Sequence, residues 1–374
     1  MDINHIHFYA HNAPQLKRWF VEALGFQFIS SFQTHHDSVE MIRSHNVFIL
    51  VSSPLTKQSR VARYLNQHPE GVAIVGFRVS DIETMIERAI AHGAQLVHPL
   101  QVERRPRGVL KWAQVQGWGE VMHTLVEPCD ARSLEMVPIP NIPSEVEAHC
   151  RVAASKTHMA PFVNIDHVVL NVAKGDLDRV VSWYEHLFGL QPQQEFAIQT
   201  DRSALHSQVL KHPKGTLQFP INEPASPNSQ IQEFLDINRG PGIQHIALQT
   251  SDIIQTIARL RQSGISFLRV PDTYYSQLRD RPGFRPSHAN WEAIAQHEIL
   301  VDWSDNNPDA MLLQTFTQPI FEQPTFFFEI IQRQTYSDGF EYRQAYGFGE
   351  GNFQALFEAM EQEQIRRGSI SESL

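Results

Sequence analysis

The sequence is poor in cysteine and in basic residues. Its two cysteines, Cys129 and Cys150, do not form a CxxC pair, which argues against a thiolate zinc site. A disulfide between them is formally possible, but so few cysteines are typical of a reducing compartment. Lys and Arg number 31 against 41 Asp and Glu, and the net charge is −10. This balance argues against binding of nucleic acid or of an anionic membrane through a basic surface.

Long apolar runs are also missing. No stretch of 18 apolar residues occurs, so no transmembrane helix is expected. The first residues, MDINHIHFYAHN, lack the basic and apolar regions of a secretory signal. We therefore predict a cytoplasmic protein that makes no membrane contact. The chain has 374 residues, of which 42% are apolar and 19% charged, and this length is enough for two globular domains.

One pattern occurs four times along the chain. Residues 3–29 and 165–193 each show an alternating strand, a polar break and a helix that ends in LG or FGL. Residues 71–97 and 242–268 each show a strand that leads to Ser-Asp-Ile, which is a helix N-cap signal, and then an amphipathic helix closed by glycine. The repeats predict an α+β protein built from four tandem βαβββ units.

A segment rich in proline and small polar residues, 137–161, separates the two pairs of units. We predict an N-terminal domain over 1–140, a linker over 141–160 and a C-terminal domain over 161–374. Repeated βαβββ units resemble the vicinal oxygen chelate superfamily, which includes glyoxalases and extradiol dioxygenases. The resemblance implies that two units pair into a half-open barrel in each domain, the barrel that surrounds a metal in that superfamily.

Three polar residues on apolar strands distinguish the second domain: His167, His245 and Glu329. Glu329 lies within PTFFFEIIQR, a buried-strand pattern in which an unpaired carboxylate is costly. The repeat aligns Ile74 with His245 and Thr124 with Glu329, so the first domain lacks both groups. Two imidazoles and one carboxylate facing one barrel form a facial triad, which favours non-haem Fe(II), with zinc as the alternative metal.

His5 aligns with His167 and carries the same local evidence. A single histidine on a strand is more often a hydrogen-bonded core residue than a metal ligand, and His5 has neither of the other two groups beside it. We therefore predict a metal site in the C-terminal domain and none in the N-terminal domain.

Six motifs follow one another in the C-terminal half: PINEP (220–224), SQIQEFL (229–235), GIQHIAL (242–248), LLQTF (312–316), FFEIIQR (327–333) and GFGEGNFQALFEAMEQEQ (347–364). In this order they resemble the 4-hydroxyphenylpyruvate dioxygenase family over roughly 160–364, whereas the N-terminal half resembles it mainly in architecture. The resemblance implies one Fe(II) per subunit, held by His167, His245 and Glu329.

The same resemblance implies a substrate pocket with polar and aromatic walls, formed by Ser207, Asn222, Gln230, Gln244, Gln314, Phe316, Phe327, Asn352 and Phe353. From the residues alone, Asn222 fits a proline-bounded turn equally well, and Gln230 fits a solvated position in a first helical turn. Spacing alone favours the core for Phe316 and Phe327. A helix that starts near Asn352, after several glycines, is implied to close the pocket.

The implied reaction converts 4-hydroxyphenylpyruvate and O₂ to homogentisate and CO₂, for tyrosine breakdown or for quinone and tocopherol supply. We also expect a homo-oligomer. The alternatives are 4-hydroxymandelate synthase, which hydroxylates the benzylic carbon of the same substrate, an extradiol-type dioxygenase, and a metal-free binding module of the superfamily. Pro220 and Asn222 within PINEP resemble the ring-hydroxylating branch, which favours the dioxygenase.

Overall fold

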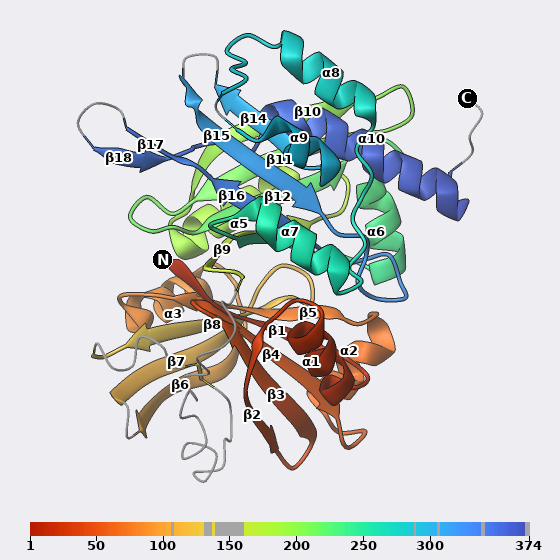
Figure 1. Ribbon diagram of the computed structural model, residues 1–374. Helices are drawn as coiled ribbons and strands as arrows, with labels where there is room; N and C mark the ends of the chain where they lie inside the picture. Colours follow the sequence, from red (N-terminus) through yellow and green to blue (C-terminus); the bar gives the residue numbers. More distant parts are fainter. Residues whose placement is uncertain are drawn as a thin grey trace.

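The computed structural model describes residues 1–105, 108–130, 137–138, 161–287, 289–304, 307–337 and 341–370. It shows two domains, one above the other in Figure 1, each built around one eight-stranded sheet. The whole predicted linker, 141–160, with Cys150 in it, lies outside the described residues, so the domain boundary stays a prediction. Cys129 carries an exposed free thiol.

The N-terminal sheet has the strand order β2-β3-β4-β1-β5-β8-β7-β6. The elements of its two units and of their connection are β1 (Asp2–Tyr9), α1 (Ala13–Glu22), β2 (Gln27–Gln33), β3 (Asp37–Ser44), β4 (Val47–Pro54), α2 (Arg60–Gln67), β5 (Gly71–Arg78), α3 (Ile82–Ala91), β6 (Leu96–Arg105), β7 (Gly108–Gln116) and β8 (Met122–Pro128). The first strands of the two units, β1 and β5, pair antiparallel at the centre, and each runs parallel to the last strand of its own unit.

The C-terminal sheet repeats this order as β10-β11-β12-β9-β13-β16-β15-β14. Its elements are β9 (Asn164–Asn171), α5 (Leu177–Phe188), β10 (Gln191–Gln199), β11 (Ala204–Lys211), β12 (Gln218–Pro224), α6 (Gln230–Asn238), β13 (Gly242–Gln249), α7 (Ile253–Gln262), α8 (Asp272–Asp280), α9 (Trp291–Gln296), β14 (Leu300–Ser304), β15 (Asn307–Phe316) and β16 (Phe327–Arg333). The helices α8 and α9 lengthen the last unit, and a small hairpin of β17 (Thr335–Ser337) and β18 (Tyr342–Gln344) precedes the final helix α10 (Glu350–Arg367). The predicted α+β fold of four βαβββ units is confirmed.

Local signals place the helices as the sequence predicts. Asp81 and Asp252 are the N-caps of α3 and α7, and each side chain accepts a hydrogen bond at 3.0 Å from the backbone N–H three residues later. Gly93 and Gly264 follow these helices in the left-handed region, at φ of 83° and 88°. Equivalent caps thus start and stop equivalent helices in both domains.

Aromatic side chains join the two domains. Phe8 of β1 is fully buried, and its ring lies 5.1 Å from Phe326 and 6.4 Å from Phe328, measured between ring centroids. Phe328 belongs to β16, on the face opposite to Glu329, because side chains alternate along a strand. The N-terminal domain therefore packs behind the strand that carries the predicted carboxylate ligand.

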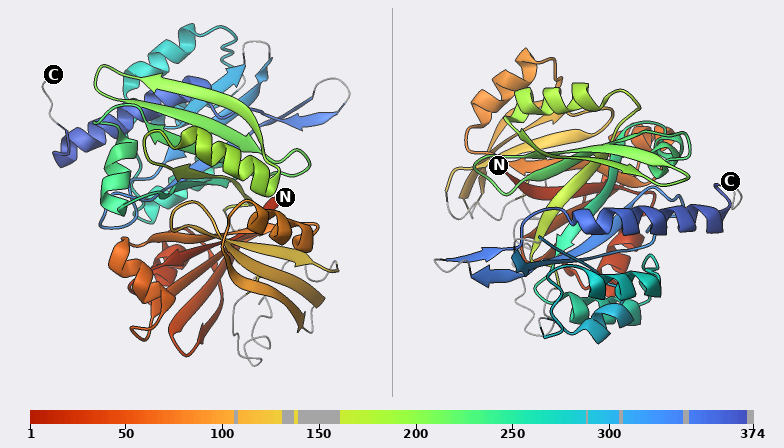
Figure 2. Two further views of the ribbon diagram at one scale, coloured as in Figure 1. Left: turned by 180° about the vertical axis from the view of Figure 1, so that it is seen from behind. Right: turned by 90° about the horizontal axis from the view of Figure 1, so that it is seen from above.

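The helix α10 lies across the C-terminal domain, between the β10–β11 hairpin and the α8–α9 segment (Figure 2). Phe353 packs 4.6 Å from Phe196 of β10, and Phe357 is buried in a cluster with Phe234 of α6. The predicted helix over the second barrel is present, but it is less amphipathic than predicted, because Asn352, Glu361 and Gln364 are buried along it together with Phe357. Among the described residues, no helix combines the length and the apolar character that crossing a membrane requires.

Candidate metal centre

Three strands bring His167, His245 and Glu329 together. The side chains come from β9, β13 and β16, neighbours in the sheet, and all three are buried. Glu329 Oε2 lies 3.1 Å from His167 Nε2 and 3.8 Å from His245 Nε2, and one ligand atom of each residue lies within 4.8 Å of the others. Within the described ranges, this is the group of His, Cys, Asp and Glu side chains that is close enough to hold a metal ion.

Strand register shows that the N-terminal domain has the same positions with different chemistry. Glu329 pairs with Ala247 across β16 and β13, and Thr124 pairs with Gly76 across β8 and β5. His5 faces Gly76 in the same way as His167 faces Ala247. The alignment of His5 with His167 and of Thr124 with Glu329 therefore holds in three dimensions.

The His5 ring lies in a different position from the His167 ring, because the neighbouring strand has Gly76 where the second domain has Ala247. A Cβ atom added at Gly76 would lie 2.2 Å from His5 Cε1, so the His5 ring occupies the space that the methyl group of Ala247 fills in the second domain. His5 is 1% exposed, its Nδ1 bonds to Asn4 Oδ1 at 2.8 Å, and burial lowers its pKa to about 3. His5 is a neutral, hydrogen-bonded core residue.

Hydrogen bonds at Nδ1 turn the Nε2 atom of both candidate ligands towards Glu329. His167 Nδ1 donates to Asp166 Oδ1 at 2.9 Å, and His245 Nδ1 donates to Gln244 Oε1 at 3.3 Å. Such partners fix the tautomer and the ring orientation of metal-binding histidines. Two Nε2 atoms and one carboxylate oxygen that face one point form a donor set that fits Fe²⁺ or Zn²⁺.

Opposite charges control protonation in the cluster. Burial by itself lowers the pKa of His167, but the charge of Glu329 and the hydrogen bond to Asp166 outweigh burial and raise this pKa to about 9. His245 shifts the other way, because burial and then the charge of His167 lower its pKa well below the usual value. Without a metal, His167 is therefore protonated beside the Glu329 carboxylate, and a divalent cation would displace that proton.

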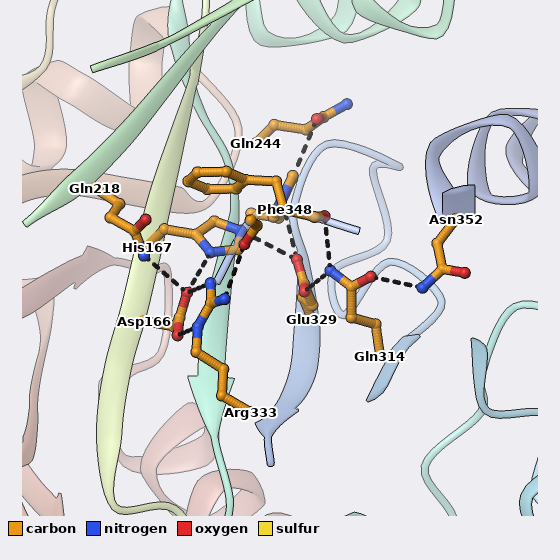
Figure 3. A network of polar contacts seen from close by, with 11 residues as sticks. Asp166, His167, Gln218, Gln244, Gln314, Glu329, Arg333, Phe348 and Asn352 are labelled. Carbon is orange, nitrogen blue, oxygen red and sulfur yellow. Dashed lines mark hydrogen bonds and ion pairs between the residues drawn. The ribbon is translucent and has the colours of Figure 1, made fainter. Parts of the chain in front are cut away.

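A buried ion pair between Arg333 and Asp166 holds the acceptor of the His167 hydrogen bond in place. Arg333 Nε lies 2.6 Å from Asp166 Oδ2, and Arg333 Nη2 lies 2.8 Å from Asp166 Oδ1 (Figure 3). Burial by itself raises the pKa of Asp166, but the charge and the hydrogen bonds of Arg333 hold that pKa far below its usual range. Asp166 therefore stays ionised and remains an acceptor for His167.

A second network fixes Glu329. Gln314 Nε2 donates to Glu329 Oε1 at 2.8 Å and to the Phe348 carbonyl at 3.1 Å, and Asn352 Nδ2 donates to Gln314 Oε1 at 2.9 Å. Tyr274 extends this chain of hydrogen bonds, because its hydroxyl donates to Asn352 Oδ1 at 2.8 Å. With Oε1 bound to Gln314, Oε2 is the oxygen that remains directed at the two imidazoles.

A small cavity of about 40 Å³ adjoins the three side chains. Six of the predicted pocket residues line it: Ser207, Asn222, Gln314, Phe316, Asn352 and Phe353. Phe348 and Leu356, from the C-terminal segment, also line it, as do Val169 and Pro220. The space accommodates a few water molecules and is too small for an aromatic acid.

The other three predicted pocket residues line a neighbouring cavity of about 20 Å³: Gln230, Gln244 and Phe327. The ring of Phe327 stacks on His245, with 4.7 Å between centroids and 19° between planes. His245 lines the first cavity and Phe327 the second, so this stacked pair lies between them. The predicted residues thus surround two small cavities.

Two alternatives that the sequence left open are wrong. Asn222 lies within β12 and donates to Asn171 Oδ1 at 3.3 Å, so PINEP is part of a strand and not a turn. Gln230 is the first residue of α6, as its position after Ser229 indicates, but it is only 7% exposed and therefore not a solvated surface residue.

Sequence reasoning missed Asp166, Arg333 and Phe348. Alternation along β9 assigns Asp166 to the face opposite to His167, but its side chain bends back to the neighbouring ring. The available signal was an acid directly before one candidate ligand and an arginine in the same motif as another. The ring of Phe348 lies 5.3 Å from that of His167.

Comparisons with known proteins agree with this architecture. Residues 164–291 match the glyoxalase/bleomycin resistance protein/dioxygenase superfamily, the class that the fold and the cluster define. Residues 1–135 match the N-terminal region of hydroxyphenylpyruvate dioxygenase. The chain belongs to the 4-hydroxyphenylpyruvate dioxygenase family.

Individual relatives cover nearly the whole chain. The 4-hydroxyphenylpyruvate dioxygenases of Coccidioides posadasii and Caenorhabditis elegans are 32% and 35% identical to it, over 98% of this chain and over 94% and 93% of their own lengths. An uncharacterised protein of Synechocystis sp. is 32% identical over 96% of this chain and 97% of its own. Among solved structures, a variant of 4-hydroxymandelate synthase from Streptomyces coelicolor has a TM-score of 0.81 at 26% identity, with 97% of this chain and 98% of that chain covered.

Proposed function

We propose that this protein is a 4-hydroxyphenylpyruvate dioxygenase, which converts 4-hydroxyphenylpyruvate and O₂ to homogentisate and CO₂. The observation that carries the proposal is the buried cluster of His167, His245 and Glu329 beside a small, aromatic-walled cavity. It lies in a chain whose relatives over nearly the full length bear this name.

The metal of the proposal is one Fe²⁺ per subunit, held by His167, His245 and Glu329. Two imidazoles and a carboxylate leave open coordination positions, the arrangement that non-haem Fe(II) oxygenases use. Bound there, Fe²⁺ supplies the electron-transfer chemistry that the side chains of a protein lack and a place for the 2-oxo acid and O₂. The negative charge of Glu329, which raises the pKa of His167, also favours a cation at this point.

The surrounding residues position the ligands and the substrate. Asp166 and Gln244 hold the histidine rings through Nδ1, and Gln314 holds Glu329 through Oε1. Ser207 and Asn222, paired across β11 and β12, offer polar groups to the substrate. These contacts fix geometry before the reaction, which lowers the entropic part of the barrier.

Aromatic walls orient the ring and exclude water. Phe316 and Phe353 line the cavity beside the cluster, and Phe327 borders the adjacent one. A cavity of about 40 Å³ cannot admit the substrate without movement of its walls. The part of the wall that comes from the C-terminal segment, with Phe348, Phe353 and Leu356, is the part we propose to move.

A second candidate, 4-hydroxymandelate synthase, is favoured by one observation, the TM-score of 0.81 to a variant of that enzyme. It would use the same cluster and the same substrate and would differ in the carbon that is hydroxylated. Relatives at 32–35% identity named as the dioxygenase favour ring hydroxylation.

Reconstitution tests both. The apoprotein is loaded with Fe²⁺ without oxygen, its iron content is measured, and 4-hydroxyphenylpyruvate and O₂ are added. We expect one iron per chain and homogentisate as the product, while a zinc-loaded sample serves as the control without turnover. Hydroxymandelate as the product would establish the second candidate, and failure to bind iron would overturn the metal site.

Three further proposals concern the whole chain: a cytoplasmic location, a homo-oligomer, and a domain boundary within 141–160. Light scattering after size-exclusion chromatography tests the second, and limited proteolysis with mass spectrometry of the fragments tests the third. Cleavage confined to sites inside either sheet would contradict the boundary.

A further inference from the structure

Arg333, the last residue of β16, contacts two parts of the molecule that have different tasks. On one side its Nε and Nη2 atoms bind Asp166, at 2.6 and 2.8 Å. On the other side its Nη1 atom donates to the carbonyls of Ala345 and Gly347, at 3.1 and 2.8 Å. The side chain is 7% exposed, and Figure 3 shows its ion pair with Asp166. One guanidinium therefore makes four hydrogen bonds. Two go to Asp166, which is 167 residues away in the sequence, and two go to carbonyls that are 12 and 14 residues away.

The first side leads to the metal cluster. Asp166 Oδ1, which Arg333 holds, is the acceptor for His167 Nδ1 at 2.9 Å. Gln218 Nε2 also points at this oxygen, at 3.4 Å. Loss of Arg333 would leave a buried carboxylate without its counter-charge, which would either protonate or turn away from His167.

The second side leads to the hinge of α10. The segment 345–349 connects β18 to this helix, and Gly347 and Gly349 in it have φ of 95° and 77°, in the left-handed region that favours glycine. Gln314 holds the same segment through the Phe348 carbonyl while it holds Glu329 through Nε2. Arg333 and Gln314 thus bind the carbonyls of three hinge residues. The same two side chains bind Asp166, which holds His167, and Glu329.

The N-terminal domain shows that the fold does not require this arrangement. Pro128 pairs with Leu110 at the position where Arg333 pairs with Leu312, and Asn4 stands where the second domain has Asp166. The equivalent sheet therefore forms without the ion pair. The pair is present in the domain that has the cluster and the closing helix.

We propose that Arg333 is a positioning residue that couples the metal centre to the hinge of α10. The inference rests on the metal site proposed above. Because one planar fork satisfies both sides, the orientation of His167 through Asp166 and the closed path of residues 345–347 stabilise each other. Metal binding then favours closure of the cavity, and closure strengthens metal binding by the same factor.

The test compares Arg333→Gln and Arg333→Lys with a matched control, Arg281→Gln. Arg281 Nη1 lies 2.6 Å from Asp302 Oδ1, and Asp302 Oδ2 accepts a hydrogen bond from the Gly351 N–H at 3.1 Å. Arg281 thus holds the start of α10 through a carboxylate. Its own partners, Asp302 and the Trp303 carbonyl, bind no metal ligand, whereas Arg333 binds Asp166, the partner of His167. Lysine at 333 keeps the charge and lacks the fork, so it can hold one side only.

Two quantities are measured on the full chain without oxygen. One is the affinity for Fe²⁺, from competition with a chelator, and the other is hydrogen exchange of the amides of residues 345–352 with and without Fe²⁺. In the wild type we expect Fe²⁺ to slow this exchange. Arg333→Gln should bind Fe²⁺ about 10- to 100-fold more weakly, the usual effect of removing an outer partner of a metal ligand, and should lose the slowing. Arg333→Lys should fall between Arg333→Gln and the wild type.

The control separates coupling from a loosened helix. Arg281→Gln should raise the exchange of the first turn of α10, while its Fe²⁺ affinity stays within about twofold of the wild type and Fe²⁺ still slows the hinge. Unchanged Fe²⁺ affinity in Arg333→Gln, or hinge protection by Fe²⁺ that persists in it, would overturn the coupling. If Arg333→Gln does not fold, the same two outcomes in Arg333→Lys decide. If the wild type itself binds no Fe²⁺, the proposed function fails, which is a distinct result.

Discussion

At the scale of single residues, a few substitutions separate a structural domain from one with a candidate metal centre. The strand positions are equivalent, but Ile74 and Thr124 replace an imidazole and a carboxylate. The exchange of Ala247 for Gly76 matters as well, because it lets the His5 ring lie against the backbone of the neighbouring strand. A methyl group at that place leaves the His167 ring to project to Glu329.

Glu329→Ala tests the cluster directly. The substitution removes the anionic ligand and leaves two neutral imidazoles, so we expect most iron binding and turnover to be lost. The measurement is iron content per chain after anaerobic loading, with product formation from 4-hydroxyphenylpyruvate. Normal iron content and activity would contradict the proposed triad.

His5→Ala is the matched substitution in the N-terminal domain. Iron content should stay at the wild-type value, because His5 bonds to Asn4 and lies outside the cluster. Loss of a buried side chain with one hydrogen bond should lower the free energy of unfolding by about 1 to 3 kcal/mol, measured by urea denaturation. Loss of iron in this variant would mean that the wrong domain has been assigned the metal.

At the scale of elements, β16 serves two surfaces at once. Phe327 and Glu329 face the cavities, while Phe328 on the other face packs against Phe8 of β1. The period of two along a strand makes this possible without any irregular backbone. We therefore expect a substitution at Phe8 or Phe328, behind the strand, to shift the Glu329 carboxylate in front.

Phe8→Ala should destabilise the protein strongly, because Phe8 is fully buried between the domains and its loss leaves a cavity. We expect the free energy of unfolding to fall by about 3 to 5 kcal/mol. Phe28→Ala, at a residue that is 49% exposed on β2, should change it by less than about 1 kcal/mol. Urea denaturation of both variants checks the difference, and equal effects would contradict the packing role of Phe8.

At the scale of the whole molecule, the N-terminal domain completes the core of the other. Both halves of the chain contribute to one buried cluster, which includes Phe8, Phe20, Phe326 and Phe328. Contacts between backbone and side chains add to it, since His68 Nδ1 bonds to the Asn238 carbonyl at 2.6 Å, at the end of α6. We therefore expect the C-terminal domain, which has the candidate metal centre, to need the N-terminal domain for its native packing.

The C-terminal half alone, residues 161–374, should not form an active unit. Without the N-terminal domain, Phe326 and Phe328 would face water, and an apolar surface of this kind leads to aggregation. Expression of this half, followed by light scattering and Fe²⁺ binding, checks the expectation, with the full chain as the reference. A monomeric half that binds iron and turns over substrate would show that the N-terminal domain is dispensable.

The sequence by itself determined the repeated units, the caps of α3 and α7, and the choice of His167, His245 and Glu329. These features are readable because alternation and capping are local and because the chain contains its own comparison, the first pair of units. Only the tertiary structure decided which side chains support the cluster. Asp166 and Arg333 are 167 residues apart and meet through the pairing of strands, and burial then makes their ion pair strong. The division of the predicted pocket into two small cavities was likewise decided by packing, because it depends on where the rings of Phe327 and Phe348 lie.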